Sequence, residues 1–218
     1  MEDSRPFVVF LFVSGTVLFE PDANLDALES ALEPRSFVLK SNEAATDAIP
    51  SIPLLNPRAV VLVDPNLTEN DNLGLWAQLR QYIWNGGTVI IPGWKWTELP
   101  DGHSDSLFEH IFFLPWRFGE PITEPLEVVM TPDYSTRRNL KLAYSGRMDV
   151  LPVPEYETRG RPMMNVDEKS KVYVTGQGLG ECMSCIYFYE SGGSIAYIGD
   201  TEMNEATIRT YQWLMGVT

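Results

Sequence analysis

The sequence is poor in the residues that build disulfides and metal sites, because its 218 residues include only two cysteines, Cys182 and Cys185, and two histidines, His103 and His110. A disulfide-built fold is therefore excluded, and a reducing compartment is favoured. Within one helix, the two histidines would lie about 10.5 Å apart along the axis, too far to bind one zinc ion together. We expect no metal and no cofactor.

Positive charge and long apolar runs are also scarce. The chain has 16 Lys and Arg against 30 Asp and Glu, a formal charge of −14. Such a charge repels phosphate backbones and anionic lipids, so we expect neither nucleic acid nor membrane partners. The apolar run at 7–13 is far shorter than the roughly 20 residues that span a bilayer, and no basic leader precedes it. We therefore predict a cytoplasmic protein.

The first part of the chain alternates apolar runs with segments of helical spacing. Strands are predicted at 7–13, 36–40, 59–63 and 88–91, and those at 7–13 and 59–63 are expected to be buried on both faces. Helices are predicted at 22–32, with Asp22 as the N-cap, at 43–48, and from 73 to 83, ending before Asn85-Gly86-Gly87. Buried strands joined by helices indicate a parallel sheet with right-handed crossovers.

The second half is less regular. A short helix is predicted at 104–113, irregular strands and long loops at 114–162, strands at 172–175, 185–189 and 194–198, and a closing helix at 202–215. Ser191-Gly192-Gly193 is typical of a hairpin turn between the last two strands. We find no convincing linker. The sequence predicts a single α/β domain over 1–218, with an open, mostly parallel sheet, helices on both faces and an irregular, β-rich second half.

Two stretches of the sequence carry a resemblance to a known family. One is Val60-Val61-Leu62-Val63-Asp64, which leads through a helix to Gly86-Gly87 and a strand; the other is Ser191-Gly192-Gly193-Ser194, which leads through a strand to Gly199-Asp200 and the closing helix. With the alternation, they resemble the class I glutamine amidotransferase-like superfamily, in its ThuA-like branch. The resemblance implies a flavodoxin-like arrangement of the sheet and helices.

The sequence departs from that superfamily where its chemistry is expected. Amidotransferases carry a nucleophilic cysteine in a tight G-x-C-x-G elbow after the fourth strand, whereas this chain has Gly93-Trp94-Lys95-Trp96-Thr97. ThuA-like relatives commonly have a histidine just past that strand, where Trp94 and Lys95 stand here. The resemblance therefore implies a domain that does not hydrolyse glutamine by the family mechanism.

The cysteines form a C-x-x-C motif that runs into a predicted strand. In a continuous strand, positions three apart point to opposite faces, so Cys182 and Cys185 are not expected to share a ligand. We interpret them as ordinary thiols; a redox pair and a metal-ligand pair are the alternatives.

The candidate site comes from topology, since ligands of open parallel sheets bind beyond the carboxyl ends of the strands. The residues expected there are Ser14, Thr16, Asp64, Asn66, Trp94, Lys95, Asp200, Thr201 and Glu202. Lys95, between Trp94 and Trp96, is either a desolvated base or an ion-pair partner of Asp64 or Asp200. The aromatic residues that follow either roof an apolar pocket or fill the core: Trp96, Phe108, Phe112, Phe113 and Trp116.

Two functions remain open. The first is a degenerate amidotransferase-like domain without glutaminase activity that binds a small apolar metabolite or a protein partner. The alternative is a metabolic enzyme (a lyase, isomerase, cyclase or hydrolase) with acid and base groups from Lys95, Asp64, His103 and Glu202. In either case the expected ligand-binding residues are Ser14, Thr16, Asn66, Trp94, Trp96, Trp116, Asp200 and Thr201. A homodimer is compatible with both.

Overall fold

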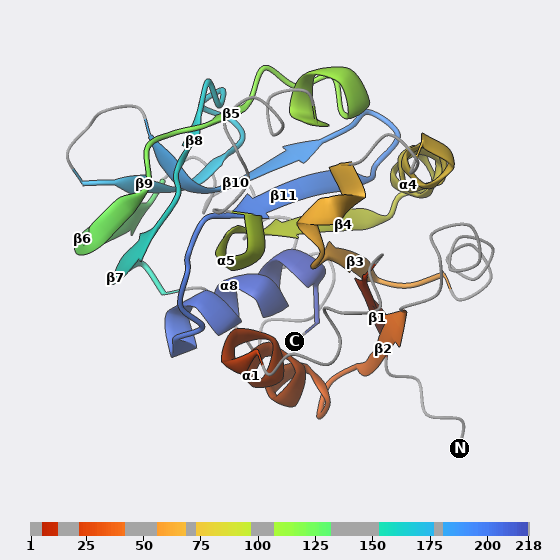
Figure 1. Cartoon of the computed structure of the whole chain (residues 1–218), viewed down its shortest axis with the longest axis horizontal. Helices are drawn as coiled ribbons and strands as arrows, with labels where there is room; N and C mark the ends of the chain where they lie inside the picture. Colours follow the sequence, from red (N-terminus) through yellow and green to blue (C-terminus); the bar gives the residue numbers. More distant parts are fainter. Residues whose placement is uncertain are drawn as a thin grey trace.

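The computed structural model describes residues 6–12, 22–41, 56–68, 73–96, 107–131, 153–176 and 181–217. One twisted sheet runs through the molecule, with its strands in the order β2-β1-β3-β4-β11-β10-β9-β6-β7 (Figure 1). None of the described helices is long and apolar enough to span a membrane.

One half of the sheet is parallel. It consists of β2 (Phe37–Ser41), β1 (Phe7–Leu11), β3 (Ala59–Leu62), β4 (Thr88–Pro92) and β11 (Ser194–Ile198), and every neighbouring pair among them is parallel. All four residues of β3 are buried, as the uninterrupted apolar run predicts for a central strand. The four strands expected before residue 92 are therefore confirmed.

The other half is antiparallel. It continues from β11 through β10 (Cys182–Phe188), β9 (Lys171–Thr175), β6 (Ile122–Met130) and β7 (Glu155–Gly160), each antiparallel to its neighbour. The cause of the reversal is the tight turn before β11, where Gly192 has φ +96°, because so short a connection can join only antiparallel strands. The expected open, mostly parallel sheet is thus correct for one half and wrong for the other: the sheet is mixed.

Two very short strands, β5 (Arg117–Phe118) and β8 (Met163–Met164), pair with each other, and β8 also pairs with β10. They place the irregular segment after residue 114 on the same sheet. The β-rich second half expected from the sequence is confirmed, as an extension of the sheet.

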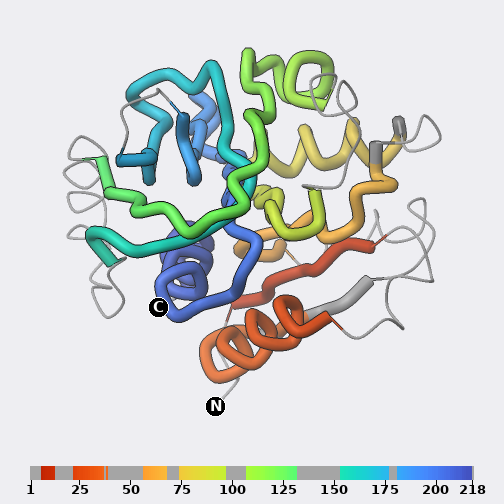
Figure 2. Tube along the Cα trace, turned by 60° about the vertical axis from the view of Figure 1, so that its left-hand side comes forward, coloured from red at the N-terminus to blue at the C-terminus, as the bar shows by residue number. Residues whose placement is uncertain are grey.

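Helices cover both faces of the sheet, as predicted. On one face, Val8 and Phe10 belong to the same apolar cluster as α1 (Ala23–Leu32) and α8 (Glu205–Met215). On the other, Val9 packs with the apolar side chains of α4 (Leu73–Trp84). Successive residues of a strand point to opposite faces, which produces the two clusters. Figure 2 shows α1 and α8 on the lower side of the strands and α4 on the upper side.

The helix ends follow the expected local chemistry. The Asp22 carboxylate caps α1, and α8 begins after Asn204, whose side chain accepts a hydrogen bond from the Thr207 amide. The closing helix is thus confirmed, with its first residue three positions later than predicted. The predicted helix at 104–113 is a single π-helical turn, Leu107–Ile111, within its described part. The helix predicted at 43–48 lies outside the described residues.

Candidate functional site

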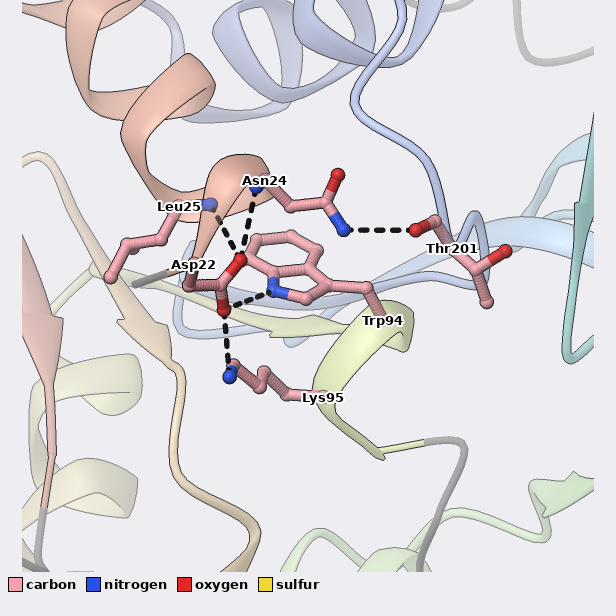
Figure 3. Close-up of polar contacts among 6 residues, drawn as sticks. All are labelled: Asp22, Asn24, Leu25, Trp94, Lys95 and Thr201. Atoms are coloured by element: carbon pink, nitrogen blue, oxygen red, sulfur yellow. Dashed lines mark hydrogen bonds and ion pairs between the residues drawn. The ribbon is translucent and has the colours of Figure 1, made fainter. Parts of the chain in front are cut away.

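At the carboxyl end of β4, the chain turns into the short helix α5 (Gly93–Trp96), which carries Lys95. The Lys95 Nζ lies 2.7 Å from Asp22 Oδ2, at the start of α1 (Figure 3). The expected partners, Asp64 and Asp200, are therefore wrong. Asp22 reaches Lys95 because the connection after β1 and the end of β4 meet at the same edge of the parallel sheet.

Asp22 is the centre of this contact. Its Oδ1 accepts hydrogen bonds from the backbone amides of Asn24 (3.0 Å) and Leu25 (3.1 Å), and its Oδ2 accepts one from Trp94 Nε1 (3.3 Å) besides the ion pair. Burial by itself would raise the pKa of Asp22, but the hydrogen bond from Lys95, the amides and the positive charge together lower that pKa below 3.8. Asp22 is thus an ionised acceptor at neutral pH.

Asn24 links the contact between Asp22 and Lys95 to the loop before α8. Asn24 Nδ2 donates to the Thr201 carbonyl (2.9 Å), and Asn24 Oδ1 accepts from the Met203 amide (3.0 Å), which joins α1 to the loop before α8 (Figure 3). The Trp94 ring packs edge-on against Tyr211 at 5.8 Å. Lys95, with 26% of its side chain exposed, is a positioned cation whose charge is matched by Asp22.

Asp64 and Asn66 form a turn after β3. Asp64 is fully buried, and its Oδ1 accepts a hydrogen bond from the Asn66 amide (3.0 Å), where a 3-10 helix (Pro65–Thr68) begins. The Asn66 side chain is exposed. The pattern is that of a helix-leading Asx turn.

Asp200 lies under α8, fully buried. Its Oδ2 accepts hydrogen bonds from Tyr156 OH (2.8 Å) and Thr207 Oγ1 (3.0 Å). Burial raises the pKa of Asp200 to about 6, although both hydrogen bonds act to lower it. The Asp200 carboxylate is closed to solvent in the structure, and its hydrogen bonds connect β7 and α8 at the end of β11. Its role is therefore to pack α8 against the sheet.

The remaining predicted residues are dispersed. Glu202 pairs with Arg159 (3.1 Å) at the exposed surface, and Thr201 Oγ1 donates to the Arg159 carbonyl (3.1 Å). Trp96 is buried and donates to the Leu62 carbonyl (2.7 Å), while Trp116 is buried at 5.6 Å from the Phe108 ring. These two tryptophans fill the core. Ser14, Thr16 and His103 lie outside the described residues.

Backbone packing leaves no room for a side chain at Gly93, two residues before Lys95, which stands where the resemblance implies a nucleophile. A Cβ on Gly93 would lie 2.6 Å from the backbone of Gly199, and a Cβ on Gly199 would lie 2.3 Å from the Arg161 carbonyl. Gly93 therefore touches the backbone at the end of β11, and Gly199 touches the backbone that follows β7, which leaves no room for a Cβ at either position.

The cysteines lie together, contrary to expectation. Cys182 and Cys185 are both fully buried in the same apolar cluster, because β10 has register shifts at Ser184, between them. Such a bulge cancels the alternation on which the prediction rested. Burial, together with the neighbouring Cys182, raises the pKa of Cys185, and both thiols are free. The described residues contain no group of three or more His, Cys, Asp or Glu that could hold a metal ion.

An apolar groove lies between α4 and the segment after the π-helical turn, and its lining includes Phe112 and Phe113 from the aromatic set expected to roof a pocket or fill the core. The sequence did not predict that α4 forms the other wall. We call this hollow the aromatic groove; its volume is about 360 Å³, and its lining is Ala77, Arg80, Gln81, Ile83, Trp84, Ile111, Phe112, Phe113 and Tyr189. Trp84 is 65% exposed and Phe113 is 73% exposed. A signal was present in the sequence, since Trp84 lies outside the apolar stripe that α4 buries.

Comparison of the sequence with protein families and with curated proteins finds no match. The fold, however, is shared with solved structures. The mmIFT52 N-terminal domain has a TM-score of 0.60 at 12% identity, over 95% of this chain and 96% of that one. A ThuA-like protein from Parabacteroides merdae ATCC 43184 has a TM-score of 0.57 at 9% identity, over 98% of this chain and 88% of that one.

Two further solved structures share this fold. A ThuA-like protein from Bacteroides uniformis ATCC 8492 has a TM-score of 0.55 at 9% identity, over 98% of this chain and 94% of that one. The exo-beta-1,4-mannosidase Op5Man5 from Opitutaceae bacterium strain TAV5 has a TM-score of 0.52 at 8% identity, over 97% of this chain but 35% of that one. At such identities the likeness concerns the fold alone, and this chain has the fold of ThuA-like proteins and of the mmIFT52 N-terminal domain.

Proposed function

We propose that this chain is a non-catalytic, amidotransferase-like domain that lacks the nucleophilic cysteine and binds a protein partner through the aromatic groove. The observation that carries the proposal is the exposure of Trp84 and Phe113 beside an apolar hollow. Large aromatic side chains in such a setting are typical of binding hot spots.

The backbone at the groove keeps the Phe113 ring exposed to solvent. Phe113 has φ +56°, a left-handed conformation that costs a bulky residue roughly 1–3 kcal/mol. Its neighbours are anchored, since Tyr189 OH donates to the Phe112 carbonyl (2.8 Å) and the Leu114 amide donates to the Phe108 carbonyl (2.9 Å). These contacts hold a strained backbone that exposes Phe113, which supports a role for its ring in binding.

The positive charge of Arg80 in the groove indicates which side chains a partner would carry. Arg80 is the only charged residue among its described lining residues, and its Cζ lies 6.0 Å from the Phe113 ring centroid. A partner segment that places an apolar side chain in the groove and an Asp or Glu beside Arg80 would match both features. Water displaced from the apolar walls would supply the driving force.

The carboxyl edge of the sheet supports a role without catalysis. Asp22 and Lys95 neutralise each other at the N-cap of α1, Asp64 holds a turn, and Asp200 is buried under α8. The fold also occurs as the N-terminal domain of mmIFT52 and as about a third of a longer mannosidase, which fits a domain that acts within larger assemblies.

The proposal is tested by selecting peptides from a random displayed library on the immobilised protein. We expect the selected peptides to combine a large apolar residue with a nearby Asp or Glu. One such peptide is then synthesised with a fluorescent label, and its Kd is measured by anisotropy for the wild type and for three variants.

Trp84→Ala removes the exposed ring, and Ala77→Glu adds a negative charge to the groove; both are expected to raise Kd at least about tenfold. Gln78→Glu is the matched control, because it adds the same charge one position along α4, at a residue that lines a different cavity. Peptides that bind Trp84→Ala and Ala77→Glu as tightly as the wild type would refute the proposal.

A further inference from the structure

A second cavity lies at the opposite edge of the sheet from Lys95. We call it the amino-edge cavity; its volume is about 650 Å³, and its walls come from the starts of β1, β3, β4 and β11 and from the ends of α4, β10 and α8. Cavities of roughly 300–1,000 Å³ are typical of small-molecule sites. The architecture predicts ligands at the carboxyl edge, so nothing in the fold assigns this cavity a role.

A single arginine gives the cavity its charge. Arg58 is the only charged residue among the described lining residues, in a chain whose net charge is −14. Its Nε donates to the Met215 carbonyl (3.2 Å), and its guanidinium lies against Gly216, where a Cβ would come within 2.7 Å of Nη2. The guanidinium is therefore fixed in place by the last turn of α8. Its Nη groups make no hydrogen bond to the described part of the chain and remain available as donors.

The rest of the lining is polar but uncharged, or aromatic. Thr88 Oγ1 and Ser194 Oγ lie 3.0 Å apart at the starts of their strands, and the amide side chain of Gln78 faces the same cavity. Phe7 and Phe188 line it as well, and both are among the exposed large apolar residues. A ligand that suits these walls has one anionic group and an apolar body.

The backbone around the cavity is shaped in an unusual way. Four of the six described residues with positive φ line it: Asn56, Gly86, Gly192 and Gly216. Asn56, at φ +43°, is the only one with a side chain, and it leads directly into Pro57 and Arg58. Glycine adopts positive φ without strain, so the three glycines mark tight turns that shape the cavity, and Asn56 alone among the four is held in a conformation that costs energy.

We infer that the amino-edge cavity binds a small organic carboxylate, whose oxygens accept hydrogen bonds from the Arg58 Nη groups while its apolar body lies near Phe7 and Phe188. The planar fork of arginine matches a carboxylate or a phosphate equally well. One positive charge balances a monoanion but leaves a phosphate dianion partly uncompensated, because no other described lining residue is charged, and this favours the carboxylate. The inference is independent of the aromatic groove.

The test is a titration of the ¹⁵N-labelled protein, followed by amide chemical shifts, with phenylacetate, hexanoate, phenylacetamide and inorganic phosphate. We expect saturable shifts of the Gly86, Gly192 and Gly216 amides with a carboxylate at concentrations well above about 1 mM, the range of a weak fragment. Phenylacetamide, which has the same shape without the charge, and phosphate are expected to bind at least about tenfold more weakly.

Two variants distinguish carboxylate binding in the amino-edge cavity from a general effect of added negative charge. Gln78→Glu places a carboxylate in the cavity wall without touching the contact between Arg58 and Met215, and it is expected to weaken phenylacetate binding about tenfold or more. Ala77→Glu, whose added charge lies in the aromatic groove, should leave that binding unchanged. The inference is overturned if no carboxylate shifts these amides, if phenylacetamide or phosphate binds as well, or if Gln78→Glu has no effect.

Discussion

Asp200→Asn tests the energetics of the buried carboxylate under α8. The pKa of Asp200 is about 6 in the folded chain, against 3.8 for an ordinary aspartate. Between these values the folded state holds a proton that the unfolded state has released, so stability falls as the pH rises through this window and stays lower above it. The difference, 6 − 3.8, corresponds to about 3 kcal/mol at 1.36 kcal/mol per unit.

Asparagine is a neutral replacement of the same shape and does not lose a proton. We therefore expect Asp200→Asn to match the wild type near pH 4 and to exceed its free energy of unfolding by up to about 3 kcal/mol at pH 7. The assay is urea unfolding from pH 4 to 7, with Glu202→Gln as an exposed control of equal charge change two residues away. A difference between Asp200→Asn and wild type that is independent of pH, or a variant less stable than wild type at pH 7, would refute the reasoning.

Three further substitutions probe the fold. Lys95→Met leaves the ionised Asp22 carboxylate, which is 11% exposed, without its cation. It should lower the free energy of unfolding in urea at pH 7 by about 1–2 kcal/mol, and this loss should be smaller in an Asp22→Asn background. Turnover of a metabolite that depends on Lys95 would instead favour the enzymatic alternative. Gly74→Ala, at an exposed helical position with open space around it, should stabilise by about 0.5–1 kcal/mol. Gly93→Ala, which would press on Gly199, should destabilise by several times that amount, and equal effects of the two alanines would contradict the packing.

Much of the fold could be predicted because its signals are local. Apolar runs such as 59–63 mark buried strands whatever surrounds them, and the Asp22 carboxylate caps the helix that follows it directly. The antiparallel half gave weaker signals. In β6 (Ile122–Met130), Val128 is the only buried residue, and burial alternates only from Leu126 to Met130, so the alternating run that indicates a strand covers only about half of the strand that forms.

The parts of the site that could not be predicted depend on contacts between distant positions. Asp22 and Lys95 are separated in the chain by the strands β2, β3 and β4, and only the order of the sheet brings them together. The burial of both cysteines in one apolar cluster could not be predicted without the bulge at Ser184, and that bulge depends on the pairing of β10 with β9. Phe113 is exposed because of its own left-handed backbone, a feature that no apolar pattern encodes.

The most direct test of the proposed function is the effect of Phe113→Asn on both peptide binding and stability. Asparagine tolerates the left-handed conformation at φ +56°, so the free energy of unfolding should be unchanged or slightly higher while the exposed ring is lost. The account predicts that the Kd of the selected peptide rises about thirtyfold, near 2 kcal/mol, because most of the Phe113 surface is free to be covered by the partner. An unchanged Kd in a folded Phe113→Asn variant would contradict the assignment of the aromatic groove as the docking surface.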